Sequence, residues 1–140
     1  MNKPIFIEEL NIGMSKTIKN MITDEDIVAF SKLTGDTNPI HLDEKFAEKS
    51  VFGKKVAHGF LYGSFISAVL GSRLPGPGSV YISQTLKFLS PVYINDVVTT
   101  TCTIKEIDLN KNRVWLDCNS FVGSKKVVEG LAVLKVPSKQ

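Results

Sequence analysis

The hydrophobic residues of this chain follow two different patterns, one before and one after residue 75. In the first half, apolar side chains recur at helical spacing, which predicts a helix over residues 24–34 and a longer one over residues 59–74. The second half lacks any alternation of strand and helix, so its strands are expected to pair in antiparallel order. Those strands are predicted from runs of β-branched and apolar residues between turn-forming residues, at 80–88, 97–107, 113–122 and 125–136, with a further short strand expected at 15–19.

Local signals mark where the predicted helices begin and end. Thr23 is followed by three acidic residues, a sequence typical of a helix N-terminus, and Gly35 supplies a stop for the first helix. Asp43, followed by a second acid, is expected to cap another short helix. Between them, Asn38-Pro39 predicts a rigid bend, because proline fixes its own φ and steers the preceding residue away from helical geometry.

The segment 59–74 is the hydrophobic centre of the predicted fold. It is apolar nearly all the way round, and a helix of this kind belongs in the middle of a domain. Gly63, Ser67 and Gly71 recur every four residues and form a stripe without bulk, so one face can approach a sheet or a ligand closely. The predicted fold class is α+β, with an antiparallel sheet wrapped around one long central helix. Edges of such a sheet are commonly covered by pairing, so a homodimer is expected.

Composition limits the classes of function. A chain of 140 residues at 43% hydrophobic can bury one core, so residues 1–140 are expected to form a single domain. The net charge of +3 comes from scattered basic residues and does not predict a nucleic-acid partner. Glu8 and Glu9 stand where a secretion signal would need apolar residues, and the most apolar window is shorter than the roughly 20 residues that cross a bilayer. A soluble, cytoplasmic protein without a membrane partner is expected.

The two cysteines, Cys102 and Cys118, show no metal-binding or redox spacing and are expected to be small buried strand residues. If the turn between them centres near Asn110, they lie almost opposite each other, whereas a one-residue change of register places them on different faces. No function is assigned to them.

The residues that suggest chemistry lie between Leu33 and Gly59. Asp36 and His41 stand five residues apart around the Asn38-Pro39 bend, which lets them face one cavity. Gly59 opens the long helix, where a backbone N–H without a side chain beside it can bind a negatively charged oxygen. From these residues alone, Asp36 and His41 fit an acid–base pair and a loop-capping pair equally well.

Three motifs carry a resemblance to a known family. The runs GDTNPIHLDEKFA, FGKKVAHGFLYGSFISAVLG and LPGPGSVYISQTLKF resemble the MaoC-like hydratase family, and specifically its (R)-specific enoyl-CoA hydratases, over roughly residues 23–136. The resemblance implies a hot-dog fold, a homodimer and a substrate tunnel near the subunit interface. It also implies catalytic roles for Asp36 and His41, a thioester-binding N–H at Gly59 and a hydrogen-bonding serine at Ser67. No cofactor and no metal are expected, because coenzyme A is part of the substrate.

The chemistry of these residues suits hydration of a trans-2-enoyl-CoA to the (R)-3-hydroxyacyl-CoA. A base must take a proton from water as its oxygen attacks Cβ, and an acid must protonate Cα. An imidazole titrates near neutral pH and can do either, while a neighbouring carboxylate holds the water. We hypothesise that Asp36 and His41 both hydrogen-bond to one water molecule and that the Gly59 N–H donates a hydrogen bond to the enolate oxygen.

Other roles for the same residues stay open. His58 is expected to be a structural residue that orients Gly59, rather than a second base. Ser67 also fits plain tight packing. A metal site would draw on Asp36, His41, Asp43 and His58, but these residues have no recognised metal-binding spacing.

Two related functions and one unrelated function compete with hydration. The fold class also serves acyl-CoA thioesterases and 3-hydroxyacyl-[acyl-carrier-protein] dehydratases, which commonly carry an acidic catalytic residue on or at the central helix. Residues 59–74 contain no Asp or Glu, which argues against both. A non-catalytic acyl-CoA-binding protein would need neither Asp36 nor His41.

Overall fold

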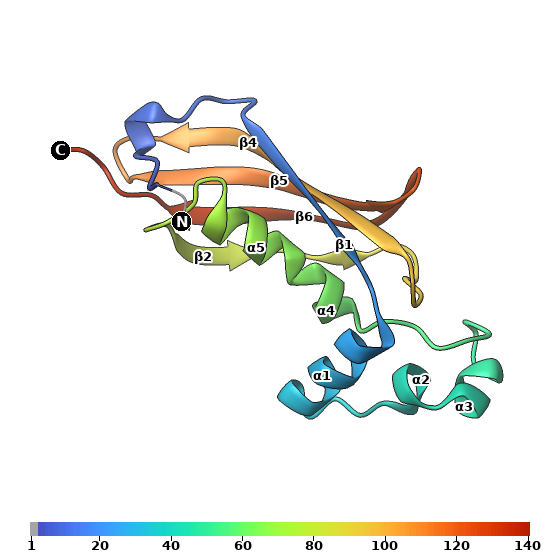
Figure 1. The fold of residues 1–140 in the computed structure, drawn as a ribbon. Coiled ribbons are helices and arrows are strands. Elements are labelled where there is room, and N and C mark those ends of the chain that lie inside the picture. The colour runs from blue at the N-terminus through green and yellow to red at the C-terminus, as the bar shows by residue number, and fades with distance from the viewer. Residues whose placement is uncertain (1–2) are drawn as a thin grey trace.

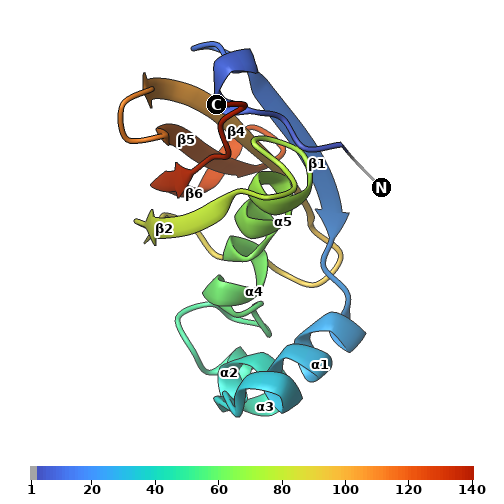
Figure 2. The same cartoon turned by 90° about the vertical axis from the view of Figure 1, so that its left-hand side faces the viewer.

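A computed structural model describes residues 3–140. The sheet is antiparallel throughout, in the order β1-β4-β5-β6-β2, with β3 also paired to β6. Its curve wraps around one side of the helical segment that contains α5 (Figures 1 and 2). The strands are β1 (Ser15–Met21), β2 (Val80–Gln84), β3 (Lys87–Phe88), β4 (Val97–Asp108), β5 (Arg113–Val122) and β6 (Lys125–Lys135). This is the predicted α+β arrangement.

One predicted strand is wrong in its extent, because residues 80–88 form two strands, β2 and β3. The chain bends between them at Thr85, whose backbone N–H and hydroxyl oxygen both bond to Leu131 on β6. The bend brings the Thr85 carbonyl against Gly130, so close that a Cβ on residue 130 would lie 1.9 Å from that oxygen. Glycine is therefore required at position 130, and the break is set by a residue on another strand.

The predicted long helix is present in two sections, α4 (Gly59–Gly63) and α5 (Phe65–Ser72). Ser64 interrupts the regular backbone hydrogen bonding of the helix. Its N–H donates to the carbonyl oxygens of both Phe60 and Leu61, and its hydroxyl donates to Leu61 O at 2.6 Å. Such shared bonds tighten a helix locally without changing its direction, and the ribbon runs on from α4 into α5 (Figure 1).

Only one face of this helical segment is buried, which corrects the expectation of a fully enclosed helix. Ile66, Val69 and Leu70 are fully buried against the sheet. On the other side Phe60 is 67% exposed. Most of the small-residue stripe also lies on the exposed side, at Ser64, Ser67, Ala68 and Gly71.

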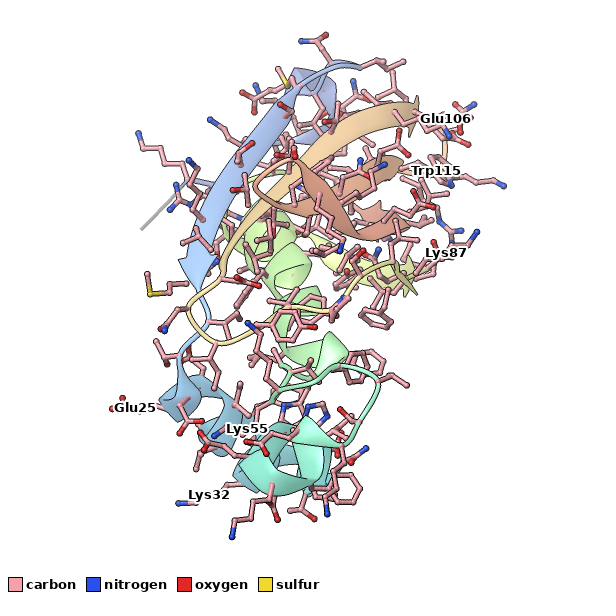
Figure 3. The ribbon with its side chains drawn as sticks, turned by 90° about the vertical axis from the view of Figure 1, so that its right-hand side faces the viewer. Glu25, Lys32, Lys55, Lys87, Glu106 and Trp115 are labelled. Atoms are coloured by element: carbon pink, nitrogen blue, oxygen red, sulfur yellow. The ribbon has the colours of Figure 1, made fainter. Side chains whose placement is uncertain are left out.

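The inner face of the sheet forms the core, with buried and less buried residues alternating along β4 and β5. Cys102 and Cys118 are register partners, both buried and both free thiols, which agrees with the first of the two predicted registers. The side-chain contact with Cys118, together with burial, raises the pKa of the Cys102 thiol, so it stays protonated and unreactive. Trp115, one position from a buried residue, projects from the outer face (Figure 3).

Helices α1 (Asp24–Thr34), α2 (Pro39–Leu42) and α3 (Glu44–Glu48) form a separate layer below α4 (Figure 2). Thr23 and Asp26 form a capping box at the start of α1, and Gly35 ends it with φ of 81°, both as predicted. Lys55, in the segment that leads to α4, pairs with Asp24 at 3.0 Å and ties that segment to this layer (Figure 3). A short 3-10 helix, η1 (Ile7–Glu9), lies before β1. Among the residues described, no helix has the length and hydropathy needed to span a membrane.

Candidate active site

Asp36 is the first residue after the Gly35 stop of α1, and its backbone is held on two sides. Its N–H donates to Thr34 Oγ1 at 3.1 Å, and its carbonyl oxygen lies 3.2 Å from Nε2 of His58. One carboxylate oxygen, Oδ1, accepts from the Asn38 N–H at 3.2 Å. The bend around Asn38 thus fixes the direction of the carboxylate and leaves Oδ2 available.

His41 lies within the single turn of α2, where only a bend was predicted, and just ahead of α3, which begins at the expected Asp43 cap. Asn38 caps this turn by accepting from Ile40 N, and Pro39 occupies its first position. The His41 ring is 7% exposed, and its Nδ1 lies 2.6 Å from Val56 O. Because a carbonyl oxygen only accepts, Nδ1 carries the proton and Nε2 keeps a free lone pair. His41 is therefore set up as a base at Nε2.

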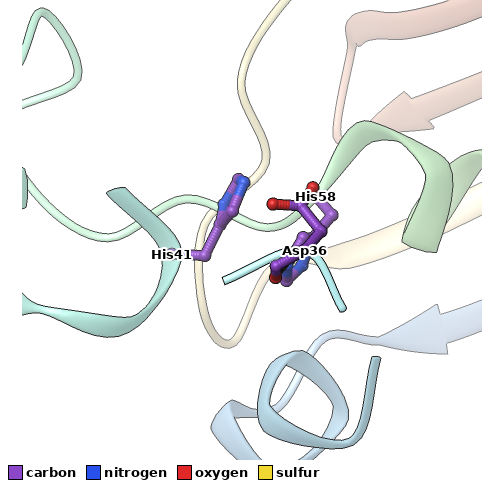
Figure 4. A group of neighbouring side chains, drawn as sticks. All are labelled: Asp36, His41 and His58. Atoms are coloured by element: carbon purple, nitrogen blue, oxygen red, sulfur yellow. Dashed lines mark hydrogen bonds between the residues drawn. The ribbon is translucent and has the colours of Figure 1, made fainter. Parts of the chain in front are cut away.

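His58 is the N-cap residue of α4, but its ring turns toward the other two groups instead of capping the helix. The rings of His41 and His58 stack, with centroids 3.8 Å apart and planes 28° apart. Figure 4 shows Asp36, His41 and His58 as one group between the start of α4 and the loops around α2. His58 was expected only to orient Gly59, whereas in the structure its ring also contacts His41 and the backbone of Asp36.

These side chains open into a cavity of about 680 Å³, within the usual range for a small-molecule site. Its lining is mainly apolar and aromatic, and burial raises the pKa of Tyr62 so that its phenol stays protonated. Gly59, the first residue of α4, has an N–H with no carbonyl partner within the helix. The cavity is lined by Phe30, Thr34, Asp36, Ile40, His41, Phe52, Val56, Ala57, His58, Gly59, Phe60, Tyr62, Phe88, Leu89, Ser90 and Pro91.

Ser67 does not join this cavity within one chain. It lies on the exposed side of α5, where it lines a smaller hollow of about 270 Å³ together with Tyr81 and Ile82 of β2. The structure thus brings three of the four predicted site residues, Asp36, His41 and Gly59, to one place and leaves Ser67 beside the edge strand.

A metal ion fits this group poorly, although one donor atom from each of Asp36, His41 and His58 lies within 4.8 Å of the others. Imidazole lone pairs lie in the ring plane, so two stacked rings do not aim both lone pairs at one point. His41 Nδ1 and His58 Nε2 are also already hydrogen-bonded. Asp43, the fourth residue of the alternative metal set, caps α3 by accepting from Phe46 N. The arrangement suits proton transfer better than coordination.

Sequence reasoning missed Ser31, the buried serine that contacts His58. It is 3% exposed on α1, and its hydroxyl lies 3.0 Å from His58 Nε2. The signal was present in the helical pattern, because Ser31 falls four residues after the buried Ile27, where an apolar residue would be expected. A buried serine on an apolar helix face needs a polar partner.

Comparison with known proteins identifies the family of this chain. The MaoC-like domain family matches residues 10–117. The chain belongs to this family. The 3-hydroxybutyryl-CoA dehydratase of Methylorubrum extorquens is 46% identical over 97% of this chain and 87% of that protein. The (R)-specific enoyl-CoA hydratase of Rhodospirillum rubrum is 42% identical over 96% of this chain and 93% of that protein.

Solved structures of MaoC-like proteins have the same fold. The unliganded R-hydratase PhaJ1 from Pseudomonas aeruginosa has a TM-score of 0.91 at 36% identity, with 97% of this chain and 88% of that chain covered. The (R)-hydratase from A. caviae has a TM-score of 0.90 at 34% identity, with 93% and 99% covered. The fold of this MaoC-like chain is the hot-dog fold.

Proposed function

We propose that this MaoC-like protein is a hydro-lyase that adds water reversibly to a trans-2-enoyl-CoA and gives the (R)-3-hydroxyacyl-CoA. The observation that carries the proposal is that the Asp36 carboxylate and His41, whose Nε2 keeps a free lone pair, line the same apolar cavity beside the start of α4, with one donor atom of each within 4.8 Å of the other. Relatives over nearly the whole chain are named as a dehydratase and a hydratase of acyl-CoA, the two directions of this reaction.

The residues divide the reaction between them. A water held by Asp36 and His41 loses one proton to His41 Nε2 while its oxygen bonds to Cβ of the enoyl thioester. The electron pair of the double bond moves toward the thioester carbonyl, whose oxygen accepts a hydrogen bond from the Gly59 N–H. The His41 imidazolium then returns that proton to Cα, which completes the product and leaves His41 neutral again, so that the H and OH of one water have been added across the double bond. Each proton-transfer role commonly contributes about 10²–10⁴ in rate, and an oxyanion donor about 10²–10³.

A second substrate form is supported by two other relatives. Mitochondrial 3-hydroxyacyl-[acyl-carrier-protein] dehydratases of Arabidopsis thaliana and Solanum lycopersicum are 36% and 34% identical, over 64% and 92% of this chain. The relatives named for coenzyme A substrates are more similar, at 46% and 42% identity. Coenzyme A is therefore the proposed carrier. Comparing kcat/KM for crotonyl-CoA and for crotonyl-acyl-carrier protein tests the choice.

The proposal includes a second copy of the chain on the edge formed by β2. β2 is the last strand of the sheet, and its Val80, Tyr81 and Ile82 side chains are exposed. The exposed small-residue face of α5 adjoins this edge, and the hollow that holds Ser67 lies between them. A partner pairing along β2 would cover both and give Ser67 neighbours from another subunit. Light scattering on the purified protein measures the mass of the assembly.

No separate cofactor enters this scheme, since the acid, the base and the oxyanion donor all come from the chain. Action in the cytoplasm, without a nucleic-acid or membrane partner, belongs to the same proposal. The test of function is the loss of absorbance of the enoyl thioester when purified protein is mixed with crotonyl-CoA, together with the stereochemistry of the product. Absence of hydration with C4, C6 and C8 substrates would contradict it.

A further inference from the structure

His58 has a hydrogen-bonding pattern that defines its tautomer. The ring is 2% exposed, and Nε2 lies 3.0 Å from Ser31 Oγ and 3.2 Å from the carbonyl oxygen of Asp36. Because the carbonyl can only accept, Nε2 must carry the proton. His58 is then an Nε2–H imidazole, whereas His41, which donates from Nδ1 to Val56 O, is an Nδ1–H imidazole. The two stacked rings are opposite tautomers.

The surroundings of His58 also keep it neutral. Its Nδ1 is buried and has no hydrogen-bond partner among residues 3–140, so a second proton placed there would have no acceptor. Burial lowers the pKa of His58, and a positive charge on His41 would act in the same direction, against the opposing effects of the Asp36 carbonyl and carboxylate. Asp36 and His41 are the titratable groups that face this ring.

Two aromatic rings also pack against the ring of His58. His41 stacks against it, and Phe30 of α1 packs against it at 4.8 Å between centroids with a 52° tilt. The His41 ring is thus held by Val56 O through Nδ1 and by the flat face of His58. Since His58 is neutral, it can support an imidazolium on His41 without like-charge repulsion.

We propose that His58 is a positioning residue: its Nε2–H holds the Asp36 carbonyl while its ring face holds the His41 ring, so that one buried side chain sets the distance between the acid and the base. Ser31 supports the same arrangement, because its hydroxyl contacts Nε2 of His58. This role rests on the proposed hydratase function, because it concerns the two residues assigned to that reaction.

The first test needs no activity. The chain has two histidines, so long-range proton–nitrogen NMR spectra of the imidazoles contain two ring systems, and His58→Gln assigns them. The expected result is one Nε2–H and one Nδ1–H ring, with the pKa of His58 below its ordinary value of about 6.5. An Nδ1–H tautomer for His58, or titration at the ordinary value, would overturn the proposal.

The second test separates the two contacts of the ring. His58→Gln keeps an N–H that can reach the Asp36 carbonyl but loses the stacking face, His58→Phe keeps the face but loses the donor, and His58→Leu loses both. Each of the first two is expected to lower kcat about 10-fold with KM within about 3-fold, and His58→Leu is expected to lower it about 100-fold or more.

Ser120→Ala is the matched control, because it removes a buried hydroxyl that pairs with Thr100 at 3.0 Å in the core, away from the cavity. It is expected to lower stability while leaving kcat unchanged. If His58→Leu keeps the wild-type kcat, or if Ser120→Ala lowers kcat equally, the positioning role is overturned and the hydratase function stands. If the wild-type protein hydrates no enoyl thioester, the function itself is overturned and the role with it.

Discussion

Replacing Gly59 by alanine tests whether the shape of the cavity wall matters separately from the backbone amide. A Cβ at residue 59 would lie 2.9 to 3.1 Å from three ring atoms of Phe88, a residue that lines the cavity. Ordinary carbon–carbon contacts are about 3.5–4.0 Å, so the Phe88 ring must move by roughly 0.5–1 Å. The ring is 45% exposed and can turn, which keeps the loss of unfolding free energy to about 1 kcal/mol or less.

The effect on activity is expected to be much larger than the effect on stability. A displacement of about 1 Å near reacting groups can cost about 10² in rate, so kcat/KM for crotonyl-CoA is predicted to fall by about 10- to 100-fold. The Gly59 N–H is retained in this variant. A fall in kcat/KM therefore measures the effect of the altered cavity wall and not the loss of a hydrogen-bond donor. Activity is measured by the absorbance of the enoyl thioester, and stability by urea unfolding.

Gly63→Ala is the matched control on the same helix. Its Cβ would lie 3.6 Å from both Leu86 and Phe88, an ordinary contact distance. It is expected to keep activity and to raise stability by about 0.5–1 kcal/mol, because alanine favours a helix over glycine. Wild-type kcat/KM in Gly59→Ala, or an equal fall in both variants, would refute the reasoning.

Three further predictions concern stability and assembly. Gly130→Ala is expected to cost about 3 kcal/mol or more, because its Cβ would lie 1.9 Å from the Thr85 carbonyl oxygen, whereas Gly71→Ala, with nothing within 4 Å, should be neutral or stabilising in the same urea titration. Ile82→Lys places a charge on the exposed edge strand and is expected to shift the mass measured by light scattering toward a single chain; an unchanged mass would exclude β2 from the interface. Because the pKa of folded His58 is lowered, the unfolded chain binds more protons below about pH 6.5, so the unfolding free energy should fall more steeply from pH 6.5 to 5.5 in the wild type than in His58→Gln; equal slopes would refute this.

Structural features that depend only on neighbouring residues could be predicted from the sequence. The capping box of Thr23 and the left-handed Gly35 define α1 because both depend on residues within one turn of the helix end. The strand over 113–122 has the predicted limits, since its alternation and its flanking turns are local. The facing of Cys102 and Cys118 needed only the length of one hairpin.

Features that depend on distant residues were wrong or incomplete. The break between β2 and β3 follows from the approach of Thr85 to Gly130 on another strand, which no pattern within 80–88 reveals. The exposed face of α5 was expected to be buried, because its small and apolar residues do not distinguish cover by the same chain from cover by another.

In the candidate site too, the features that depend on neighbouring residues could be predicted, and those that depend on distant residues could not. Asp36 and His41 are joined by a short bend, so their shared cavity follows from the Asn38-Pro39 sequence. The role of His58 could not be predicted, because it depends on Ser31, 27 residues away, and on a ring stack that exists only when α1, α2 and α4 meet. The place of Ser67 in catalysis stays a prediction, since in one chain it lines a different hollow.

The central claim is that one carboxylate and one imidazole together hold the water and carry its proton during hydration. Asp36→Asn and His41→Gln keep the size of each side chain and remove its acid–base function, so the direct measurement is the rate of crotonyl-CoA hydration by each variant, with folding checked by circular dichroism. The expected result is a loss of about 10²–10⁴ in kcat for each variant in a folded protein. Hydration at the wild-type rate by either variant would contradict the account.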